Sequence, residues 1–334
     1  MKAAILDEKG ISCREVDEPM VGGGQVKVKV AYCGICGSDI PRVVDGKVHF
    51  YPIILGHEFS GTVAEVGKGV TRFKTGDRVA GIPLIPCMEC DSCAKGFYSL
   101  CSDYRFIGSS VYGAYAEFVC VPEDKLFIIS DSINLVDASM IEPCSVARHA
   151  FGLAEVRGKD VAVIGSGTIG LFAVQWAKIM GARSVTMVTH GRKDLPLTIL
   201  KADAVVASDD CQSKADVIID CAGTEDSIMM DLEMAKPRCF LVIVGTSVAD
   251  ITFPVKQWQK IARKEMTVKG SWMSYSRPFP GLEWTDTIDK MANGQITTDV
   301  IPRTIIEIED LSDVFSEIAE GRRRGKTIIR IADD

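Results

Sequence analysis

The sequence is short of positive charge. It contains 38 lysines and arginines against 45 aspartates and glutamates, which gives a formal net charge of −7. Nucleic-acid-binding domains usually carry a basic face. The one basic run, Arg322–Arg324, lies among acidic residues and is interpreted as a solvated turn. The composition therefore predicts no nucleic-acid partner.

A long uninterrupted hydrophobic run is also absent. The most apolar stretch, residues 161–180, carries one charge, at Lys178, and is interrupted by Gly165, Gly167 and Gly170. These glycines fit a buried strand, a tight turn and a helix better than a membrane span. The first residues, MKAAILDEKG, become charged too early for a signal peptide. We therefore expect a cytoplasmic protein with no membrane partner.

Cysteine, in contrast, is plentiful, with twelve residues. Four of them form the pattern C-x2-C-x2-C-x7-C, namely Cys87, Cys90, Cys93 and Cys101. Four thiolates from one loop can close a tetrahedral shell around Zn²⁺ and leave no position for a substrate. The pattern therefore predicts a structural zinc site. The other cysteines are scattered through apolar segments, which is typical of free thiols in a reducing cytoplasm.

Ligands for a second, open metal site lie elsewhere in the chain. Cys36 stands in CGICGSD, His57 and Glu58 stand in GHEFSG, and Glu142 stands in IEPCSV. A catalytic zinc keeps one coordination position for water or substrate, so this set predicts a catalytic zinc. The spacing leaves both Glu58 and Glu142 open as the ligand that completes the shell. Asp39 is a candidate hydrogen-bond partner for the ligand imidazole.

Ser38 follows Cys36 by two residues. Its hydroxyl would there lie close enough to a substrate hydroxyl to pass a proton to solvent. The alternative is a turn-forming serine at the start of a short helix. We predict the proton relay.

The order of the expected elements divides the chain into three parts. Residues 1–145 read as short strands separated by Gly and Pro, with period-two alternation in QVKVKVAYCG, and predict a β-rich, barrel-like domain that holds both zinc sites. Residues 146–272 alternate apolar strands with helices, which predicts a doubly wound parallel (Rossmann) sheet. Residues 273–334 end in the strand KTIIRIA and are expected to return to the first domain. The predicted fold class is α/β.

A glycine motif marks the second domain. The run VAVIGSGTIG places G-x-G-x-x-G directly after an apolar strand and at the start of an apolar helix. The first glycine permits the tight turn, the second lets a pyrophosphate approach the backbone, and the third lets helix and strand pack closely. The helix N-terminus supplies amide donors for the phosphates. The predicted cofactor contacts are Gly165, Gly167, Thr168, Ile169, Gly170, Thr189, Arg192 and Gly245.

The second strand of this domain, SVTMVT, lacks the acid that usually follows it and binds the ribose hydroxyls. The sequence instead reads Thr189, His190, Gly191, Arg192 and Lys193. A carboxylate would repel a 2′-phosphate, whereas Thr, Arg and Lys can receive one, so this segment favours NADP over NAD. A solvated loop whose basic residues face water is the alternative.

Taken in order, CGICGSD, GHEFSGTVAEVG, the four-cysteine loop, IEP and GSGTIG resemble the zinc-dependent medium-chain dehydrogenase/reductase family over essentially the whole chain. The pair Glu142-Pro143, in place of a second cysteine ligand, is similar to the polyol dehydrogenase branch. The stretches CGSDIPRVVDGKVHFYPIILGHEFSG, KGFYSLC and GSWMSYSRPFPGLEW are similar to members that act on polyol phosphates such as galactitol 1-phosphate.

The resemblance implies a GroES-like catalytic domain, a Rossmann domain, two zinc sites and NAD(P) as cofactor. The implied zinc ligands are Cys36, His57, Glu142 and the exchangeable Glu58 at the catalytic site, and Cys87, Cys90, Cys93 and Cys101 at the structural site. Ser38 is the implied proton relay. Many members carry a histidine near this serine, whereas Ile40 and Pro41 stand here. The proton would therefore leave through water or the cofactor ribose.

A phosphorylated polyol needs positive partners. Arg42 is the best candidate because a guanidinium can grip two phosphate oxygens at once, and His49 follows in the same segment. Trp272 and Tyr275 are candidates for a wall over the sugar chain, with ordinary core packing as the alternative. The family resemblance also implies a homodimer or a homotetramer.

The predicted function is hydride transfer between the secondary hydroxyl of a polyol phosphate and NAD(P), which gives the keto-sugar phosphate. A dehydrogenase of unphosphorylated polyols (sorbitol or L-iditol) or of L-threonine is the close alternative. A non-catalytic zinc- and dinucleotide-binding regulator is the alternative from another class. A zinc-free quinone reductase would have no use for the four-cysteine loop.

Overall fold

The structure is a computed structural model that describes residues 1–190 and 196–332. The chain forms two compact units, each assembled from separate segments. Unit 1 consists of Met1–Glu142, Ser276–Trp284 and Pro302–Asp334, and unit 2 consists of Pro143–Tyr275 and Thr285–Ile301.

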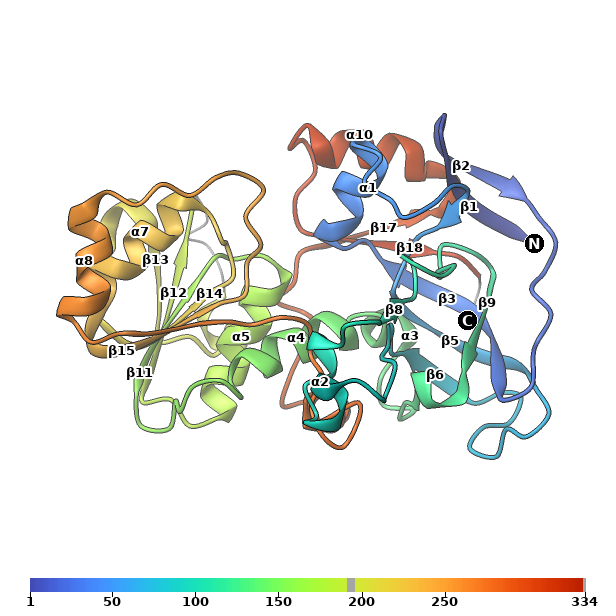
Figure 1. Ribbon diagram of the computed structural model, residues 1–334, viewed down its shortest axis with the longest axis horizontal. Coiled ribbons are helices and arrows are strands. Elements are labelled where there is room, and N and C mark those ends of the chain that lie inside the picture. The colour runs from blue at the N-terminus through green and yellow to red at the C-terminus, as the bar shows by residue number, and fades with distance from the viewer. Residues whose placement is uncertain (191–195, 333–334) are drawn as a thin grey trace. The chain divides into compact units, whose positions relative to one another are not determined.

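Unit 1 is built around a seven-stranded sheet (Figure 1). Its strands are β3 (Gln25–Gly34), β5 (Glu58–Val66), β6 (Arg78–Gly81), β9 (Phe118–Pro122), β10 (Leu126–Ile128), β17 (Arg303–Glu307) and β18 (Lys326–Arg330). The order is β10-β6-β5-β3-β18-β17, and β9 pairs with β3 off this path. The expected return of KTIIRIA to the first domain is observed, because β18 pairs antiparallel with β3.

Strand β3 follows from its side-chain alternation. Val26, Val28 and Val30 are fully buried, whereas Lys27 and Lys29 lie between them on the opposite face. Successive side chains of a strand point to opposite faces of the sheet. The apolar face therefore turns to the core and the lysines turn away from it.

Two smaller sheets and several short helices complete unit 1. Strand β1 (Lys2–Asp7) pairs with β2 (Gly10–Glu15) and β4 (Ile53–Ile54), and β7 (Leu84–Ile85) pairs with β8 (Arg105–Phe106). The helical elements are η1 (Gly37–Asp39), α1 (Ile40–Val44), α2 (Asp91–Ala94), η2 (Tyr98–Leu100), η3 (Glu123–Lys125), α3 (Leu135–Ala138), η5 (Ile308–Asp310) and α10 (Leu311–Ala319).

The core of unit 1 joins side chains that are far apart in the sequence. Helix α10 buries Leu311, Val314 and Phe315, which are spaced three and four residues apart and so share one helix face. The Phe315 ring lies 6.5 Å from the Tyr115 ring. This cluster fixes the C-terminal segment against the N-terminal strands.

Unit 2 contains a six-stranded parallel sheet (Figure 1). Its strands are β11 (Asp160–Ile164), β12 (Ser184–Thr189), β13 (Ala204–Ala207), β14 (Ala215–Asp220), β15 (Ala235–Ile243) and β16 (Thr267–Gly270). The order β13-β12-β11-β14-β15-β16 is the doubly wound arrangement of dinucleotide-binding folds. The predicted α/β class with a Rossmann sheet is confirmed.

Helices and a short helical turn lie between successive strands of this sheet along the chain: α5 (Thr168–Ile179), α6 (Leu197–Leu200), η4 (Ser208–Asp210), α7 (Glu225–Met234) and α8 (Val255–Arg263). Helix α4 (Ile141–Ala150) precedes β11, and α9 (Leu282–Ala292) follows β16. Residues 170–177 of α5 are all buried, as expected of a helix that is apolar on every side. Within the described residues, no helix is both long and apolar enough to cross a membrane.

The structure corrects one predicted segment. The sequence predicts that residues 273–334 return as a whole to the first domain, whereas Thr285–Ile301 belongs to unit 2. Gln175 of α5 provides the physical reason. Its side-chain oxygen accepts the Thr297 N–H at 2.9 Å, and its side-chain amide donates to the Thr297 carbonyl at 3.0 Å. Such long-range hydrogen bonds leave no trace in a local sequence pattern.

Candidate functional site

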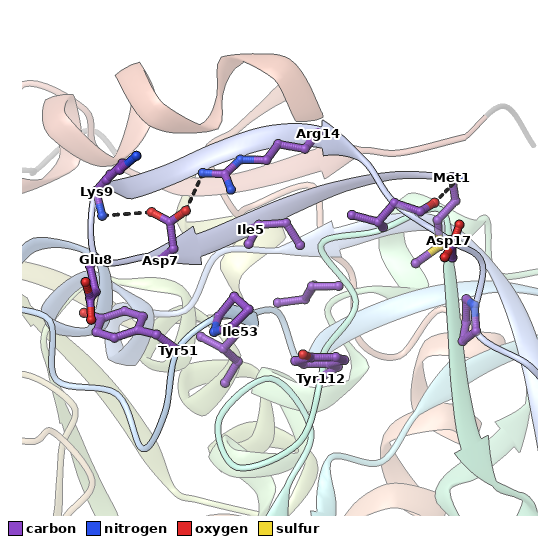
Figure 2. Close-up of a pocket in the computed structure, with 14 residues that line it drawn as sticks. Met1, Ile5, Asp7, Glu8, Lys9, Arg14, Asp17, Tyr51, Ile53 and Tyr112 are labelled. Carbon is purple, nitrogen blue, oxygen red and sulfur yellow. Dashed lines mark hydrogen bonds and ion pairs between the residues drawn. The ribbon is translucent and has the colours of Figure 1, made fainter.

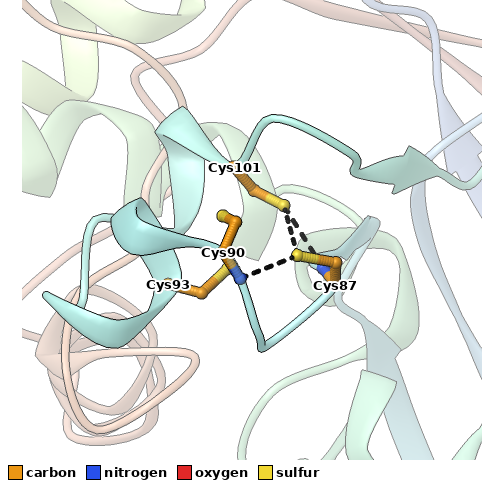
Figure 3. Close-up of side chains that lie close together, drawn as sticks. All are labelled: Cys87, Cys90, Cys93 and Cys101. Carbon is orange, nitrogen blue, oxygen red and sulfur yellow. Dashed lines mark hydrogen bonds between the residues drawn. The ribbon is translucent and has the colours of Figure 1, made fainter.

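The four predicted structural cysteines lie together in unit 1 (Figure 3). Their sulfur atoms all lie within 4.8 Å of one another. Cys93 belongs to the short helix α2, and Cys101 directly follows η2. The loop therefore folds back on itself to bring the four thiols to one point.

Backbone amides in this loop point at the sulfur atoms. The Cys87 N–H donates to Cys101 Sγ at 3.3 Å, and the Cys90 N–H donates to Cys87 Sγ at 3.4 Å. Backbone hydrogen bonds lower the pKa of Cys90 to about 6, whereas burial raises the pKa of Cys93 to about 12. Donors aimed at sulfur stabilise thiolates, and a tetrahedral thiolate set is what zinc requires. The loop therefore fits a structural zinc ion.

The open ligand set gathers in unit 1 where β3 ends and its neighbour β5 begins, both central strands of the main sheet. Cys36 directly precedes η1, and His57 and Glu58 lie at the start of β5. One ligand atom from each of these three residues lies within 4.8 Å of the others. His57 and Glu58 are almost completely buried. Residues 21 positions apart meet because β3 and β5 pair and bring Gly34 opposite Glu58.

Glu58 is also held by a buried lysine from the last strand. Lys326 Nζ donates to Glu58 Oε2 and, at 2.9 Å, to the Ile35 carbonyl. The ion pair fits because Gly34, which lies opposite Glu58, has no side chain. A Cβ added at Gly34 would lie 2.3 Å from Glu58 Oε2 and 2.8 Å from Lys326 Cε. A buried carboxylate needs such a partner, since removing one member of a buried ion pair costs about 3–5 kcal/mol.

Negative groups dominate this buried cluster. Burial, followed by the charges of Glu58 and Asp39, raises the pKa of Cys36 to about 11. Burial raises the pKa of Glu142 to about 8, an effect that His57 opposes and Glu58 and Cys36 reinforce. A divalent cation would offset this surplus and hold the thiol as thiolate. The donor set therefore fits a zinc ion.

Glu142 lies near the open set without belonging to its compact group of three. His57, Glu58 and Cys36 all affect its pKa, yet the ligand atoms that lie within 4.8 Å of one another come from Cys36, His57 and Glu58. Glu142 therefore stays a predicted ligand, and Glu58 is the carboxylate that this structure brings to the thiol and the imidazole.

Asp39 lies behind the open set and is fully buried. Its Oδ2 accepts the Cys36 N–H at 3.1 Å and the Tyr115 hydroxyl at 2.8 Å. Its Oδ1 lies 3.7 Å from His57 Nδ1, and both atoms are buried without a hydrogen-bond partner among the described residues. A carboxylate beside a ligand imidazole orients the ring for metal binding, but 3.7 Å is longer than a hydrogen bond, so the role of Asp39 as the hydrogen-bond partner of the imidazole stays a prediction.

The predicted substrate and relay residues of unit 1 have different surroundings. Ser38 is exposed, and its side chain counters the rise in the pKa of Cys36. His49 is exposed in the segment after α1. Arg42, in contrast, directs its guanidinium into the chain, where it donates to the Ser38 carbonyl at 2.6 Å and to Ser109 Oγ at 3.2 Å.

The glycine motif of unit 2 forms a tight turn between β11 and α5. Gly165 has φ of +96°, a conformation that glycine adopts readily. An added Cβ at Gly170 would lie 1.9 Å from the Gly165 carbonyl oxygen, whereas one at Gly167 would meet nothing within 4 Å. The backbone at Gly167 therefore faces open space at the N-terminus of α5, which is where a pyrophosphate binds in this fold. Thr168 and Ile169 form the first turn of the helix.

A second close backbone contact lies at the ends of β14 and β15. An added Cβ at Gly245 would lie 2.4 Å from the Gly223 nitrogen, and one at Gly223 would lie equally close to Gly245. Asp220, the last residue of β14, accepts the Ala222 and Gly223 amides at 2.8 and 3.0 Å. Carboxyl ends of the strands form the ligand-binding edge of a doubly wound sheet, so Gly245 lies at the edge where a cofactor contact was expected.

The other residues of unit 2 that were predicted to contact cofactor or substrate differ in how far they are buried. Thr189 is buried, and its Oγ1 lies 2.6 Å from Ser166 Oγ in the glycine turn. Arg192 lies outside the described residues. Trp272 is half exposed, but Tyr275 is only 2% exposed, which favours the packing role for that tyrosine.

A buried pair of acids lies beside the Asp220 turn. Asp231 of α7 is fully buried, and no described donor hydrogen-bonds to either of its oxygens. Burial, reinforced by the neighbouring Asp220 carboxylate, raises the pKa of Asp231 well above its usual range. Asp220 accepts hydrogen bonds from two backbone amides and from the Ser227 hydroxyl. Asp231 therefore keeps its proton in the folded protein at neutral pH.

Asp231→Asn is expected to make folding stability less dependent on pH. The folded state retains a proton that the unfolded state loses above about pH 3.9. Stability therefore falls by about 1.4 kcal/mol per pH unit between that value and the raised folded pKa. Asparagine cannot ionise and has nearly the same shape as the protonated acid. The advantage of the variant over the parent should grow as pH rises across this interval, which urea unfolding at several pH values measures.

Asp226→Asn is the matched control, because Asp226 is an exposed acid in the first turn of the same helix. It should shift stability by a constant amount at all these pH values. Parallel stability curves for the parent and Asp231→Asn would show that Asp231 is ionised in the folded protein, contrary to this assignment.

A groove of about 710 Å³ lies elsewhere on unit 1 (Figure 2). Its lining includes the apolar side chains of Ile5, Ile53, Tyr51 and Tyr112 and an ion pair between Asp7 and Arg14. None of the described residues predicted to bind metal, cofactor or substrate lines it. The groove is therefore separate from the candidate site.

Comparisons with known proteins agree with this geometry. The family model described as alcohol dehydrogenase GroES-like domain matches residues 22–131, and the one described as zinc-binding dehydrogenase matches residues 168–292. Galactitol 1-phosphate 5-dehydrogenase of Escherichia coli K12 is 36% identical over 345 aligned residues, which cover 98% of this chain and 99% of that protein. The chain belongs to the zinc-dependent medium-chain dehydrogenase/reductase family. The resemblance carried by its motifs is confirmed.

Solved structures and a further relative extend this picture of the dehydrogenase. The crystal structure of galactitol-1-phosphate dehydrogenase from E. coli matches with a TM-score of 0.92 and 35% identity, covering 99% of this chain and 100% of that one. An NADP-bound putative zinc-binding dehydrogenase from Sinorhizobium meliloti matches at 0.86 and 29% identity, covering 98% of both chains. D-xylulose reductase A of Aspergillus oryzae is 31% identical, covering 89% of this chain and 87% of that protein.

The protein is therefore a zinc-type alcohol or polyol dehydrogenase, an oxidoreductase of small-molecule substrates.

Three residues of the site and its surroundings, Lys326, Ser109 and Asp231, were not singled out from the sequence. No local signal marks Lys326, because a lysine at the first position of a strand is ordinarily exposed. Asp231 stands in a helical run, EDSIMMDLEM, whose other acids are exposed.

Proposed function

We propose that this dehydrogenase oxidises the secondary hydroxyl of a polyol phosphate of the galactitol 1-phosphate type to the keto-sugar phosphate. The observation that carries the proposal is the intact set of Cys36, His57 and Glu58 in a chain aligned almost end to end with galactitol 1-phosphate 5-dehydrogenase. The reaction removes the hydroxyl proton and the carbinol hydride, which passes to NAD(P)⁺ to give NAD(P)H.

Cys36, His57 and Glu58 would hold the catalytic zinc, with Glu142 as a further ligand, and the four-cysteine loop would hold the structural one. When bound, the catalytic zinc supplies Lewis acidity that lowers the pKa of a hydroxyl group. Ser38 Oγ takes the hydroxyl proton and passes it to water, which its exposure supports. The glycine turn orients the dinucleotide through backbone amides at the start of α5.

We further propose NADP as the preferred cofactor. Strand β12 ends at Thr189, and the four residues directly after it, 190–193, contain no acid, so the position that usually binds the ribose hydroxyls carries no carboxylate to repel a 2′-phosphate. The NADP in the S. meliloti neighbour supports this preference. The ratio of kcat/KM for NADP to that for NAD should exceed one. A ratio below one would contradict the preference without affecting the reaction class.

A dehydrogenase of unphosphorylated polyols is the second candidate, and the similarity to D-xylulose reductase favours it. His49 and Trp272 are exposed and are proposed to contact the substrate in either case. A regulator without catalysis is disfavoured by the intact ligand set.

The twelve cysteines, all within the described residues and all free, support a location in a reducing cytoplasm. Family resemblance supports a homodimer or homotetramer, which sedimentation measures.

A substrate panel tests the proposal. The zinc-loaded protein is assayed with galactitol 1-phosphate, galactitol, sorbitol, xylitol and L-threonine, with NAD and NADP, and its metal content is measured alongside. We expect kcat/KM for galactitol 1-phosphate to exceed that for galactitol by about 100-fold, because a site built for a polar group discriminates strongly against its absence. Faster turnover of a free polyol would assign the second candidate. Two zinc ions per chain without any turnover would leave the regulator.

A further inference from the structure

Arg42 of α1 is largely buried for an arginine, with 20% of its side chain exposed. Its Nη1 donates to the Ser38 carbonyl at 2.6 Å, and its Nη2 donates to Ser109 Oγ at 3.2 Å. Nη1 also lies 3.5 Å from Asp39 Oδ1. The planar fork that would grip two phosphate oxygens is thus directed at the chain itself.

These contacts join two segments that both reach the open ligand set. Ser38 lies in η1, in the turn that begins at Cys36. Ser109 follows β8, whose Phe106 ring lies edge-on to the His57 ring at 5.3 Å. One guanidinium therefore links the turn that carries the thiol to the segment that packs on the imidazole.

The charge of Arg42 also serves Asp39. This fully buried carboxylate faces Arg42 at 3.5 Å and His57 at 3.7 Å through the same oxygen, Oδ1. Its other oxygen is fixed by the Cys36 amide and the Tyr115 hydroxyl. A buried charge without a partner is costly. Arg42 therefore fixes the position of Asp39 Oδ1, the atom that faces the His57 ring.

We propose that Arg42 is a positioning residue that holds Ser38, Asp39 and, through Asp39, His57 in the geometry of the open ligand set, and that it is not the phosphate ligand of the substrate. The proposal revises the role predicted for Arg42 and rests on the proposed function only for its kinetic test. Its metal test is independent of any substrate.

Arg42→Lys tests the proposal because lysine keeps the charge but cannot donate in a fork to Ser38 and Ser109 together. We expect kcat to fall about 10–100-fold for galactitol 1-phosphate and for galactitol alike, with the ratio of their KM values unchanged. Ser109→Ala, which removes one anchor and keeps the guanidinium, should give a smaller fall in kcat of the same pattern.

Zinc release to a chelator supplies the second readout. The zinc at the open ligand set should be released from Arg42→Lys about tenfold faster than from the parent protein. The release rate of the zinc in the four-cysteine loop should be unchanged. Arg78→Lys is the matched control. Arg78 of β6 also bridges carbonyl oxygens, those of Ser130 and Ile133, with 26% of its side chain exposed. Among the described residues it makes no hydrogen bond or ion pair with the open ligand set.

Two results would overturn the proposal. A rise in KM confined to the phosphorylated substrate would make Arg42 a phosphate ligand. Kinetic constants and zinc release equal to those of the parent would show that the fork positions nothing. Should the parent lack activity on every polyol, the proposed function fails, and the zinc-release comparison still decides the role of Arg42.

Discussion

Cys36→Ser is expected to reduce turnover by at least about a thousandfold, ~4 kcal/mol in the activation barrier, while leaving the protein folded. The pKa of the buried thiol is raised to about 11 by burial and by the charges of Glu58 and Asp39, so a thiolate exists here only when a cation compensates it. A serine hydroxyl is a poorer zinc ligand than a thiolate. The variant should therefore lose one zinc per chain along with its activity.

Measurements of kcat/KM, zinc content and melting temperature check this result together. Cys120→Ser is the control, because Cys120 is a half-buried thiol of β9 in the same unit, bonded to the Pro19 carbonyl at 3.9 Å. It should retain both metals and parental activity. Parental activity in Cys36→Ser would remove the thiol from the reaction.

Cys93→Ser, in contrast to Cys36→Ser, is expected to lower the folding stability of the protein more than its turnover. A structural zinc site contributes its binding free energy to folding, and loss of one thiolate opens a closed shell. We expect a loss of about 3–5 kcal/mol, which corresponds to a fall in melting temperature of about 10–15 °C in a unit of this size. Metal content should fall to one zinc per chain.

The loss should spread beyond the loop because other segments of unit 1 pack on it. The Tyr98 ring lies 5.2 Å from the Phe279 ring, and Lys125 Nζ lies 4.1 Å from that ring. Residues 276–284 should therefore become accessible to protease in the variant. Cys211→Ser, a half-buried thiol of unit 2, should show neither effect. An unchanged melting temperature with two zinc ions would refute the structural role of Cys93.

Much of the fold could be predicted because its signals are local. The alternating burial in β3 and the glycine turn after β11 each depend on fewer than about twelve consecutive residues. Side-chain periodicity can be recognised over stretches of that length. The four cysteines gather because short spacings leave the loop few other ways to fold. The family resemblance follows from the order of these same motifs.

The rest depends on contacts between distant segments. Gln175 forms hydrogen bonds with Thr297, which is 122 positions away in the sequence. No rule based on local spacing predicts this contact, which holds Thr285–Ile301 in unit 2. The role predicted for Arg42 rests on its forked guanidinium and on the expected phosphate of the substrate, whereas its actual neighbours depend on how α1 meets the segment after β8. The choice between Glu58 and Glu142 likewise depends on strand register, which pairs Gly34 with Glu58.

The ion pair between Lys326 and Glu58 has a consequence for how the protein is made. The two residues are 268 positions apart, and Lys326 stands in the last strand. During synthesis Glu58 leaves the ribosome long before its partner exists, and β3 must keep an open edge until β18 arrives. We therefore expect the proposed catalytic site to bind its ion late in biogenesis, whereas the thiol-rich loop can bind its own ion while the chain is still growing.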